Sequence, residues 1–494
     1  MFRPNQLILA LVLCLASFAA AQETHSHEAP EQLGEVSFPV SCKPAVQKEF
    51  NRAVALLHSF AYTASEAAFQ TIAQQDSSCA MAHWGMAMAH FHQLWQPPVA
   101  PSSYHDAQLE IDQAQKITGA SDRERKFIHA ASLIFGDSST PYATRVLAYE
   151  RAMAEVSSEN KSDSEAQVFY ALALLASASP ADKTHANQKK AADLLEPIFR
   201  SAPHHPGAAH YLIHAYDNAE LAQRGLPAAR LYAQIAPSAP HALHMPSHIF
   251  TRLGLWEDSV ASNLAARQAA HRAGDIGEEL HAMDYLVYAY LQLGREAEAA
   301  QIIQQLKTMT SPSNGDFKVS YASTAMPVRY LVERGQWQDA AALSDPGPVP
   351  PEVAAIVVWA RGVGGARGKS SSPDSASADE LQKLQEQLQT SGSTYWATQV
   401  RVMRNEVLAW NANAAHNAPF AVALMREAAD LEDSLEKLPV TPGPIIPARE
   451  QLADLLREQG SFDQAVKEYQ AALANAPGRR NAVQGLAAAT ARAR

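Results

Sequence analysis

The composition of this 494-residue chain is that of a folded protein with a large buried core. Hydrophobic residues make up 47% of the chain and charged residues 18%, which excludes global disorder. The formal net charge is −11 and no basic stripe runs along the sequence, so we expect no nucleic-acid partner.

The first 21 residues have the pattern of a secretory signal. Arg3 supplies a positive charge, residues 7–21 are apolar, and the run ends in three alanines before Gln22, as at a cleavage site. We therefore predict a cleavable signal peptide over residues 1–21 and a periplasmic or secreted mature protein. This run is short for a membrane span and no later run is long enough, so we expect no transmembrane helix.

Residues 22–43 are mostly polar, and we predict a flexible N-terminal segment there. Once the signal is removed, Cys42 and Cys79 are the remaining cysteines. Two cysteines in an exported chain most simply form one disulfide. Two separate buried thiols are the alternative.

From Pro44 onward the pattern is helical almost to the end, without the sustained alternation typical of strands. A helix-turn-helix repeat is clearest near the C-terminus, where the positions of the tetratricopeptide (TPR) consensus are filled by Gly460, Ala465, Tyr469, Ala472 and Pro477. The same phase recurs in segments that begin at Gly254, Gly294 and Gly335. We predict an all-α solenoid of the TPR type, a superhelix of antiparallel helix pairs.

Composition divides the predicted solenoid into parts. Residues 44–345 hold the N-terminal and central repeats, and residues 381–494 hold the C-terminal repeats. Residues 346–380 are rich in proline, glycine and serine, which predicts an exposed linker. The proline-rich stretch Thr441–Pro447 is expected to separate the last repeat.

Histidine recurs at the period of the repeat. His210 and His214 form one pair at i,i+4, and His244 and His248 form another, 34 residues later. Thirty-four is the TPR period, and residues four apart lie on the same helix face. We therefore expect four imidazoles to converge on one patch of the concave groove.

Counting from the turn glycines places Asp284 beside His244 and Tyr288 beside His248 on the next stacked helix. Imidazole and carboxylate together suit zinc, copper, iron or nickel. The predicted metal ligands are His210, His214, His244, His248 and Asp284, and the predicted groove-lining residues are His281, Tyr288 and Asp217.

Two other interpretations of these histidines stay open, namely a histidine-lined peptide groove and plain hydrogen bonds between helices. Pro246 lies inside the helix of the second pair, where it could delay the helix start and loosen the pairing. For His58 we favour a packing role, and for His205, just before a proline at a repeat boundary, a loop role.

Four segments carry a resemblance to a known family: SCKPAVQKEFNRAVALLHSFAY, CAMAHWGMAMAH, HHPGAAHYLIHAYD and HALHMPSHIFTRLGLW. They resemble an exported bacterial TPR-repeat family of poorly defined function, in which PG-x-x-HY-x-IHA and HMPSHI segments are hallmarks. The resemblance covers most of residues 34–340 and implies a TPR solenoid, but it implies no particular activity.

The sequence contains no His-Glu-x-x-His motif, no phosphate-binding Gly-x-x-x-x-Gly-Lys and no Gly-x-Ser-x-Gly elbow. It therefore predicts an exported TPR binding or scaffold protein, with a peptide or protein partner in the concave groove and a metal-binding site among the groove histidines. The alternative is a metal-dependent enzyme, a hydrolase or oxidoreductase, that uses these histidines. No catalytic residue is assigned.

Overall fold

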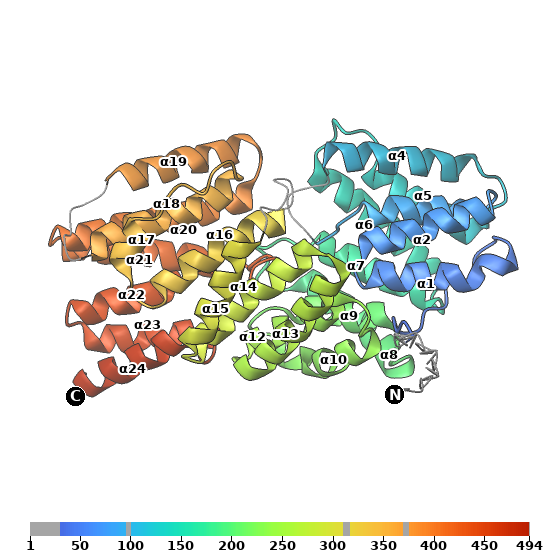
Figure 1. The fold of residues 1–494 in the computed structure, drawn as a ribbon. Helices are drawn as coiled ribbons and strands as arrows, with labels where there is room; N and C mark the ends of the chain where they lie inside the picture. The colour runs from blue at the N-terminus through green and yellow to red at the C-terminus, as the bar shows by residue number, and fades with distance from the viewer. Residues whose placement is uncertain (1–29, 95–99, 310–316, 369–374, 494) are drawn as a thin grey trace, which may run out of the picture. The chain divides into compact units, whose positions relative to one another are not determined.

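The computed structural model describes residues 30–94, 100–309, 317–368 and 375–493 (Figure 1). The described chain is α-helical, with one short 3-10 helix, η1 (Pro44–Val46), and these ranges contain no strand. The predicted signal peptide, residues 1–21, lies outside the described residues. Within the same ranges, none of the helices combines the length and apolar character needed to cross a bilayer.

The helices follow one another with short connections. The first twelve are α1 (Gln47–His58), α2 (Tyr62–Gln75), α3 (Ala80–Ala89), α4 (Pro101–Lys116), α5 (Asp122–Ile134), α6 (Tyr142–Glu159), α7 (Ser164–Ala176), α8 (Ala186–Ser201), α9 (Pro206–Tyr216), α10 (Ala222–Ile235), α11 (Pro240–His244) and α12 (Pro246–Arg252). The others are α13 (Trp256–Ala273), α14 (Ile276–Gln292), α15 (Glu296–Thr308), α16 (Phe317–Val332), α17 (Trp337–Ala341), α18 (Pro351–Arg367), α19 (Ser375–Thr390), α20 (Thr394–Ala414), α21 (Ala418–Asp433), α22 (Ala448–Glu458), α23 (Phe462–Asn475) and α24 (Arg480–Arg492).

The packing is that of a helical-repeat solenoid. Most helices pack against the next helix in the chain (Figure 1). The first helices of neighbouring pairs also pack on each other, for example α7 on α9, α14 on α16 and α18 on α20. Gly254 and Gly294 adopt positive φ angles of 68° and 73° at their turns. This conformation is strained for a residue with a Cβ atom, whereas glycine adopts it readily. The predicted all-α TPR-type solenoid is confirmed.

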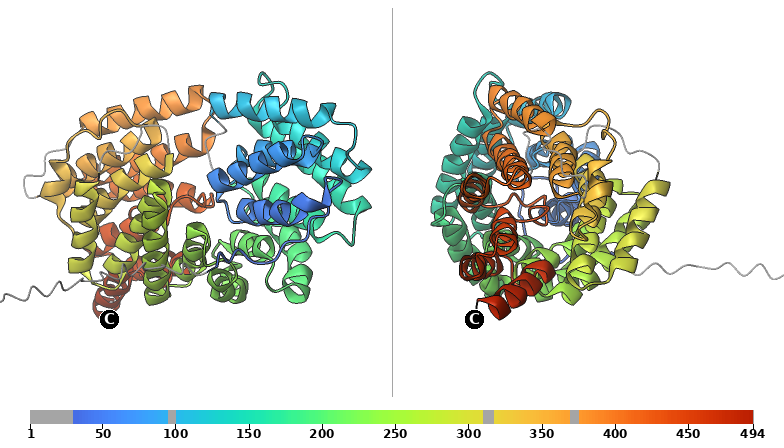
Figure 2. Two further views of the ribbon diagram at one scale, coloured as in Figure 1. Left: turned by 45° about the vertical axis from the view of Figure 1, so that its right-hand side comes forward. Right: turned by 90° about the vertical axis from the view of Figure 1, so that its left-hand side faces the viewer.

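Contacts also join repeats that are far apart in sequence. Helix α24 packs on α14, so that the C-terminal end of the chain lies against its middle (Figure 2). The indole Nε1 of Trp256 donates to the carbonyl of Gly478 at 3.1 Å. Residues 32–494 form one compact unit that contains both the central and the C-terminal repeat regions.

The stretch before the first helix is packed where it is described, contrary to the prediction of a flexible segment over residues 22–43. Phe38 is fully buried, with its ring near those of Phe50, Trp84 and Phe127. The predicted disulfide between Cys42 and Cys79 is present and joins this stretch to the start of α3. The aromatic side chain and the cross-link together hold a polar sequence in place.

The predicted linker over residues 346–380 is also wrong for most of its length, because α18 occupies Pro351–Arg367. This helix is buried, with Trp359 only 1% exposed. Its glycines serve close packing: a Cβ on Gly364 would lie 2.6 Å from the backbone of Trp337 and Ala341, and one on Gly362 would lie 2.7 Å from Val407. A helix face that needs glycine for contact looks in sequence like a flexible stretch.

The connection between α21 and α22, residues 434–447, runs through the interior. Val440, Ile445 and Ile446 on it are at most 7% exposed. The buried guanidinium of Arg329 donates to the carbonyls of Gly443, Pro444 and Ile445 at 2.9–3.3 Å. Thr441–Pro447 therefore does separate the last repeats, as predicted, but as a buried connection held from within.

Candidate metal centre

Six histidines gather in the interior, on helices α9, α11, α12 and α14. None is more than 8% exposed; they are His210, His214, His241, His244, His248 and His281. They form two groups, His210 with His214 and His241, and His244 with His248 and His281. In each group every residue offers one ring nitrogen, and these nitrogens all lie within 4.8 Å of one another. We call them triad A (His210, His214, His241) and triad B (His244, His248, His281).

The two i,i+4 pairs have the same geometry. The Nε2 atoms of His210 and His214 are 3.1 Å apart, and so are those of His244 and His248. Pro246 does not break the second pair, because Met245 keeps helical angles of −52° and −36° between α11 and α12. The pairing predicted from the sequence is therefore present in both repeats.

In triad B, the hydrogen bonds fix where the protons of the neutral rings lie. The amide nitrogen of Asn263 donates to the carbonyl of Ser259 at 2.7 Å, so its oxygen faces His244. The Nδ1 of His244 lies 2.7 Å from that oxygen and must donate to it. The Nδ1 of His248 lies 2.9 Å from a carboxylate oxygen of Asp217 and donates in the same way. Since a neutral imidazole carries one proton, both Nε2 atoms bear lone pairs.

The surroundings keep Asp217 charged and the rings of His244 and His248 neutral. Burial alone would raise the pKa of Asp217, but Lys437 and Arg252 outweigh it and hold the pKa well below its ordinary value. Burial lowers the pKa of His248 to about 4, in spite of Asp217. It also lowers the pKa of His244 well below its ordinary value, and the neighbouring His248 adds to this effect. Two lone pairs thus face each other at 3.1 Å without a proton between them.

Triad A shares this arrangement at two of its rings. The Nδ1 of His210 lies 2.6 Å from the backbone carbonyl of His58, which can only accept, so this nitrogen carries the proton. The Nδ1 of His241 lies 3.1 Å from a carboxylate oxygen of Glu278. Burial would raise the pKa of Glu278, but the charge of Lys318 and the hydrogen bond from His241 outweigh it and hold this pKa well below its ordinary value. Among the described residues, the Nδ1 of His214 has no hydrogen-bond partner.

A third group, His58, Glu165 and His205, is of a different kind. The Nδ1 of His205 accepts from the backbone of Ala208, so its Nε2 carries the proton and donates to Glu165 at 3.0 Å. His58 uses Nε2 toward the other oxygen of Glu165 at 2.8 Å and Nδ1 toward the hydroxyl of Tyr211 at 3.0 Å. Every ring nitrogen here has a hydrogen-bond partner, so this group is a closed network.

The other residues predicted for the site lie elsewhere. Neither oxygen of Asp284 makes a hydrogen bond to a described residue. The Nε of Arg329 lies 3.9 Å from it, and burial raises its pKa to about 6. The hydroxyl of Tyr288 accepts from Arg479 at 3.0 Å. Asp284 belongs to neither triad.

His281 and Tyr285 take the places that counting had given to Asp284 and Tyr288. The ring of His281 is centred 4.3 Å from that of His244, and the ring of Tyr285 is 5.2 Å from that of His248. Stacked repeats rotate relative to one another, so equal counting from the turn glycines does not bring side chains level. The residues of α14 that contact the second histidine pair therefore lie about one helical turn closer to the start of α14 than counting predicted.

Sequence reasoning missed His241, Glu278 and Lys437. His241 had a signal, since it lies three residues before His244, on the same helix face. Lys437 had none, because its contact with Asp217 joins residues 220 positions apart. Asp217 was predicted to line the groove, and it lies between His248, Arg252 and Lys437 in the interior.

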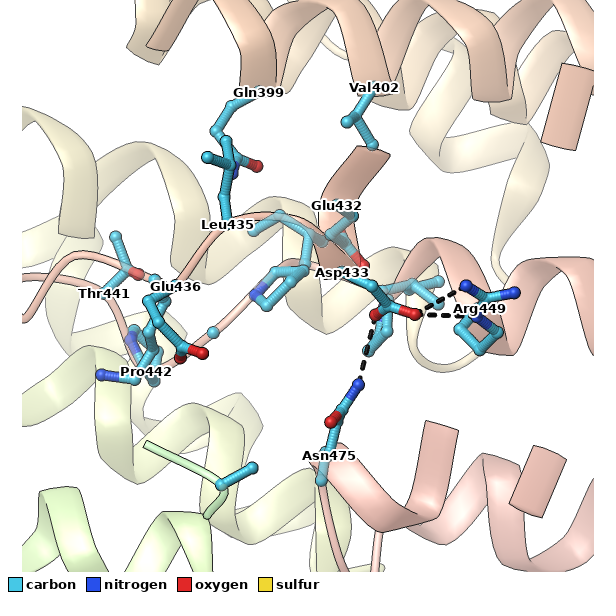
Figure 3. Close-up of a pocket in the computed structure, with 18 of the residues that line it drawn as sticks. Gln399, Val402, Glu432, Asp433, Leu435, Glu436, Thr441, Pro442, Arg449 and Asn475 are labelled. Carbon is cyan, nitrogen blue, oxygen red and sulfur yellow. Dashed lines mark hydrogen bonds and ion pairs between the residues drawn. The ribbon is translucent and has the colours of Figure 1, made fainter. Parts of the chain in front are cut away.

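A cavity of about 400 Å³ adjoins this region (Figure 3). Arg252, Lys437 and Tyr288 are part of its lining, together with Glu432, Asp433 and Arg449, of which the last two are paired at 2.6 Å. None of the six histidines lines it. The cavity and triad B therefore meet through Asp217, which contacts His248 and is contacted by Arg252 and Lys437 from the cavity side.

Known proteins resemble this chain at low similarity. No family model and no curated protein matches it. Among solved structures, a monomeric mutant of IFIT1 with m7Gppp-AAAA is 11% identical and has a TM-score of 0.37, over 84% of this chain and 82% of that one. Yeast Tom70 is 10% identical with a TM-score of 0.32, over 90% and 88%. The TPR domain of P58(IPK) is 10% identical with a TM-score of 0.20, over 91% and 98%.

Proposed function

We propose that this chain is an exported helical-repeat metalloprotein that holds a transition-metal ion with triad B. The observation that carries the proposal is the pair of Nε2 lone pairs of His244 and His248, 3.1 Å apart in the buried interior. Such a contact repels unless a cation lies between the two nitrogens.

The spacing fits shared ligation. Metal–nitrogen bonds of about 2.0–2.1 Å to two nitrogens 3.1 Å apart give an N–metal–N angle of about 100°. This value lies between the right angle of square or octahedral sites and the tetrahedral angle. His281 supplies a third nitrogen within 4.8 Å of the other two.

The residues behind the rings support the same proposal. A histidine ligand usually donates its other N–H to a carboxylate or a carbonyl oxygen, which fixes the ring and its tautomer. Asp217 has this role for His248, and the amide oxygen of Asn263 has it for His244. Three neutral imidazoles suit zinc or copper, with iron and nickel as further candidates.

The burial of the triad bears on the kind of function. Catalytic sites keep a position open to substrate, whereas structural sites are closed. No histidine of triad B lines the adjoining cavity, which favours a structural or ion-holding role. A metal-dependent hydrolase or oxidoreductase is the second candidate, supported by Arg252 and Lys437, which line the cavity and contact Asp217 behind His248.

A role in binding a protein or peptide is compatible with a metal, since helical solenoids offer extended surfaces. The buried histidines do not form an open groove, and the connection over residues 434–447 packs near them, with the hydroxyl of Tyr285 donating to the carbonyl of Thr441 at 3.3 Å. A partner would therefore use another surface of the solenoid.

The test is the metal content of the untagged chain, measured by mass spectrometry after purification without chelator. The apo protein is also titrated with zinc, copper, iron and nickel salts. We expect the wild type to hold one metal equivalent more than His281→Gln and as much metal as His205→Gln, the matched control in the closed network. A wild-type chain that neither contains nor takes up any of these metals would refute the proposal.

A further inference from the structure

We propose that triad A binds a second metal ion, so that the histidine cluster is a paired centre with one ion at each of two consecutive repeat interfaces. This inference extends the proposed function and rests on the same ligand chemistry. It concerns different residues, which makes it separately testable.

The first argument is the equivalence of the two triads. Each consists of an i,i+4 pair from one repeat and a single histidine from the first helix of the next repeat. His210 and His214 on α9 are joined by His241 on α11, and His244 and His248 on α11 and α12 are joined by His281 on α14. The same 3.1 Å separation occurs in both pairs. A geometry that binds a metal at one interface is therefore repeated at the other.

The second argument is the proton positions in triad A. His210 donates from Nδ1 to a backbone carbonyl, and His241 donates from Nδ1 to the charged carboxylate of Glu278. With the proton on Nδ1, each ring presents Nε2 as a lone pair. Metal ligands need this deprotonated nitrogen, so two of the three rings are set in the binding tautomer.

His214 is the ring of triad A whose hydrogen bonding favours neither tautomer. His214 could donate from Nε2 to His210, but this would leave its buried Nδ1 as an acceptor without a donor. As a metal ligand through Nε2 it would have an Nδ1 proton with no acceptor. Losing the partner behind a ligand typically costs 10–100-fold in metal affinity. The missing partner behind His214 should therefore weaken triad A relative to a triad in which every ring has one.

The two ions would be close neighbours. The rings of His241 and His244, one from each triad, are centred 6.1 Å apart, and those of His214 and His248 are 5.9 Å apart. A carboxylate stands behind one ligand in each triad, Glu278 in triad A and Asp217 in triad B. These charges offset part of the repulsion between two buried cations.

The experiment titrates the apo chain with Co²⁺ and with Zn²⁺, following visible absorption for cobalt and heat for zinc. Wild type should bind two ions. His241→Gln and His281→Gln should each lose one ion and keep the other, and His205→Gln should keep both. Far-UV circular dichroism checks that each variant is folded.

His214→Gln is the second variant for triad A, because the hydrogen bond that it removes lies within the triad. A wild type that saturates at one ion, or a folded His241→Gln or His214→Gln that still binds two, overturns the paired centre. If His281→Gln alone loses an ion, the proposed function stands and the second site fails. If His281→Gln loses none while His241→Gln loses one, the proposed site fails and triad A stands.

Discussion

Asp217 is the residue whose replacement should disturb the interior most. Its carboxylate accepts from the Nδ1 of His248 at 2.9 Å, the Nε of Arg252 at 2.9 Å and the Nζ of Lys437 at 2.7 Å. An Asp217→Asn substitution keeps the size of the side chain and removes its charge. Two buried cations then lose their carboxylate, while the amide oxygen can still accept from His248.

The size of the effect follows from what each cation can do. Breaking a buried ion pair from one side costs about 3–5 kcal/mol. Lys437 can lose its proton, since burial already lowers its pKa to about 8, and at pH 7 this relief costs about 1.4 kcal/mol. Arg252 stays charged, and its remaining carboxylate, Glu436, is 3.7 Å away. We expect the free energy of unfolding to fall by about 3 kcal/mol at pH 7.

The pH dependence has a definite sign. Without Asp217, the pKa of Lys437 in the folded state falls below 8, so the folded variant binds fewer protons than the unfolded chain over a wider range. The stability deficit should therefore shrink as the pH rises toward 8 and level off above it. Urea denaturation between pH 6 and 9 with chelator present measures this, with the exposed Asp193→Asn on α8 as a control expected within about 0.5 kcal/mol of wild type. A deficit below about 1 kcal/mol, or one that does not shrink with pH, would refute the reasoning.

Three further predictions concern other parts of the molecule. Replacing both Cys42 and Cys79 by serine removes a cross-link spanning 37 residues and should cost about 4 kcal/mol in urea denaturation, and reduced wild type should match the variant. Burial raises the pKa of Glu432 to about 8, so stability should fall as the pH rises from 4.5 to 8; in thermal melts Glu432→Gln should flatten this fall, and an unchanged profile would contradict the assignment. Arg329→Met removes the donor to three carbonyls of the α21–α22 connection and should speed amide exchange over residues 440–447 at least tenfold, about 1.4 kcal/mol of local opening, while exchange in α5 stays unchanged.

The sequence was sufficient for features that depend on local spacing. The helical period and the turn glycines predicted the solenoid, and the two i,i+4 histidine pairs survive even at Pro246. Spacing of four along one helix is set by helix geometry alone, which is why these pairs could be predicted.

Relations between helices were harder to predict. Asp284 and Tyr288 were expected beside the second pair, but His281 and Tyr285 lie there. The offset of α14 along α11 and α12 depends on how the helices pack, and the spacing of residues within each helix does not determine it. Four histidines were expected to form one set, whereas each pair takes its third member from the next repeat. The contact of Lys437 with Asp217 depends on a buried connection from far along the chain.

Helix α11 contributes His241 to one triad and His244 to the other. In a solenoid each repeat is held mainly by its two neighbours, so the array can come apart piece by piece. Ions at both interfaces would tie α9, α11 with α12, and α14 into a single cooperative block. Loading the metal would then raise the melting temperature of this central block, and α24, which packs on α14, would be stabilised with it.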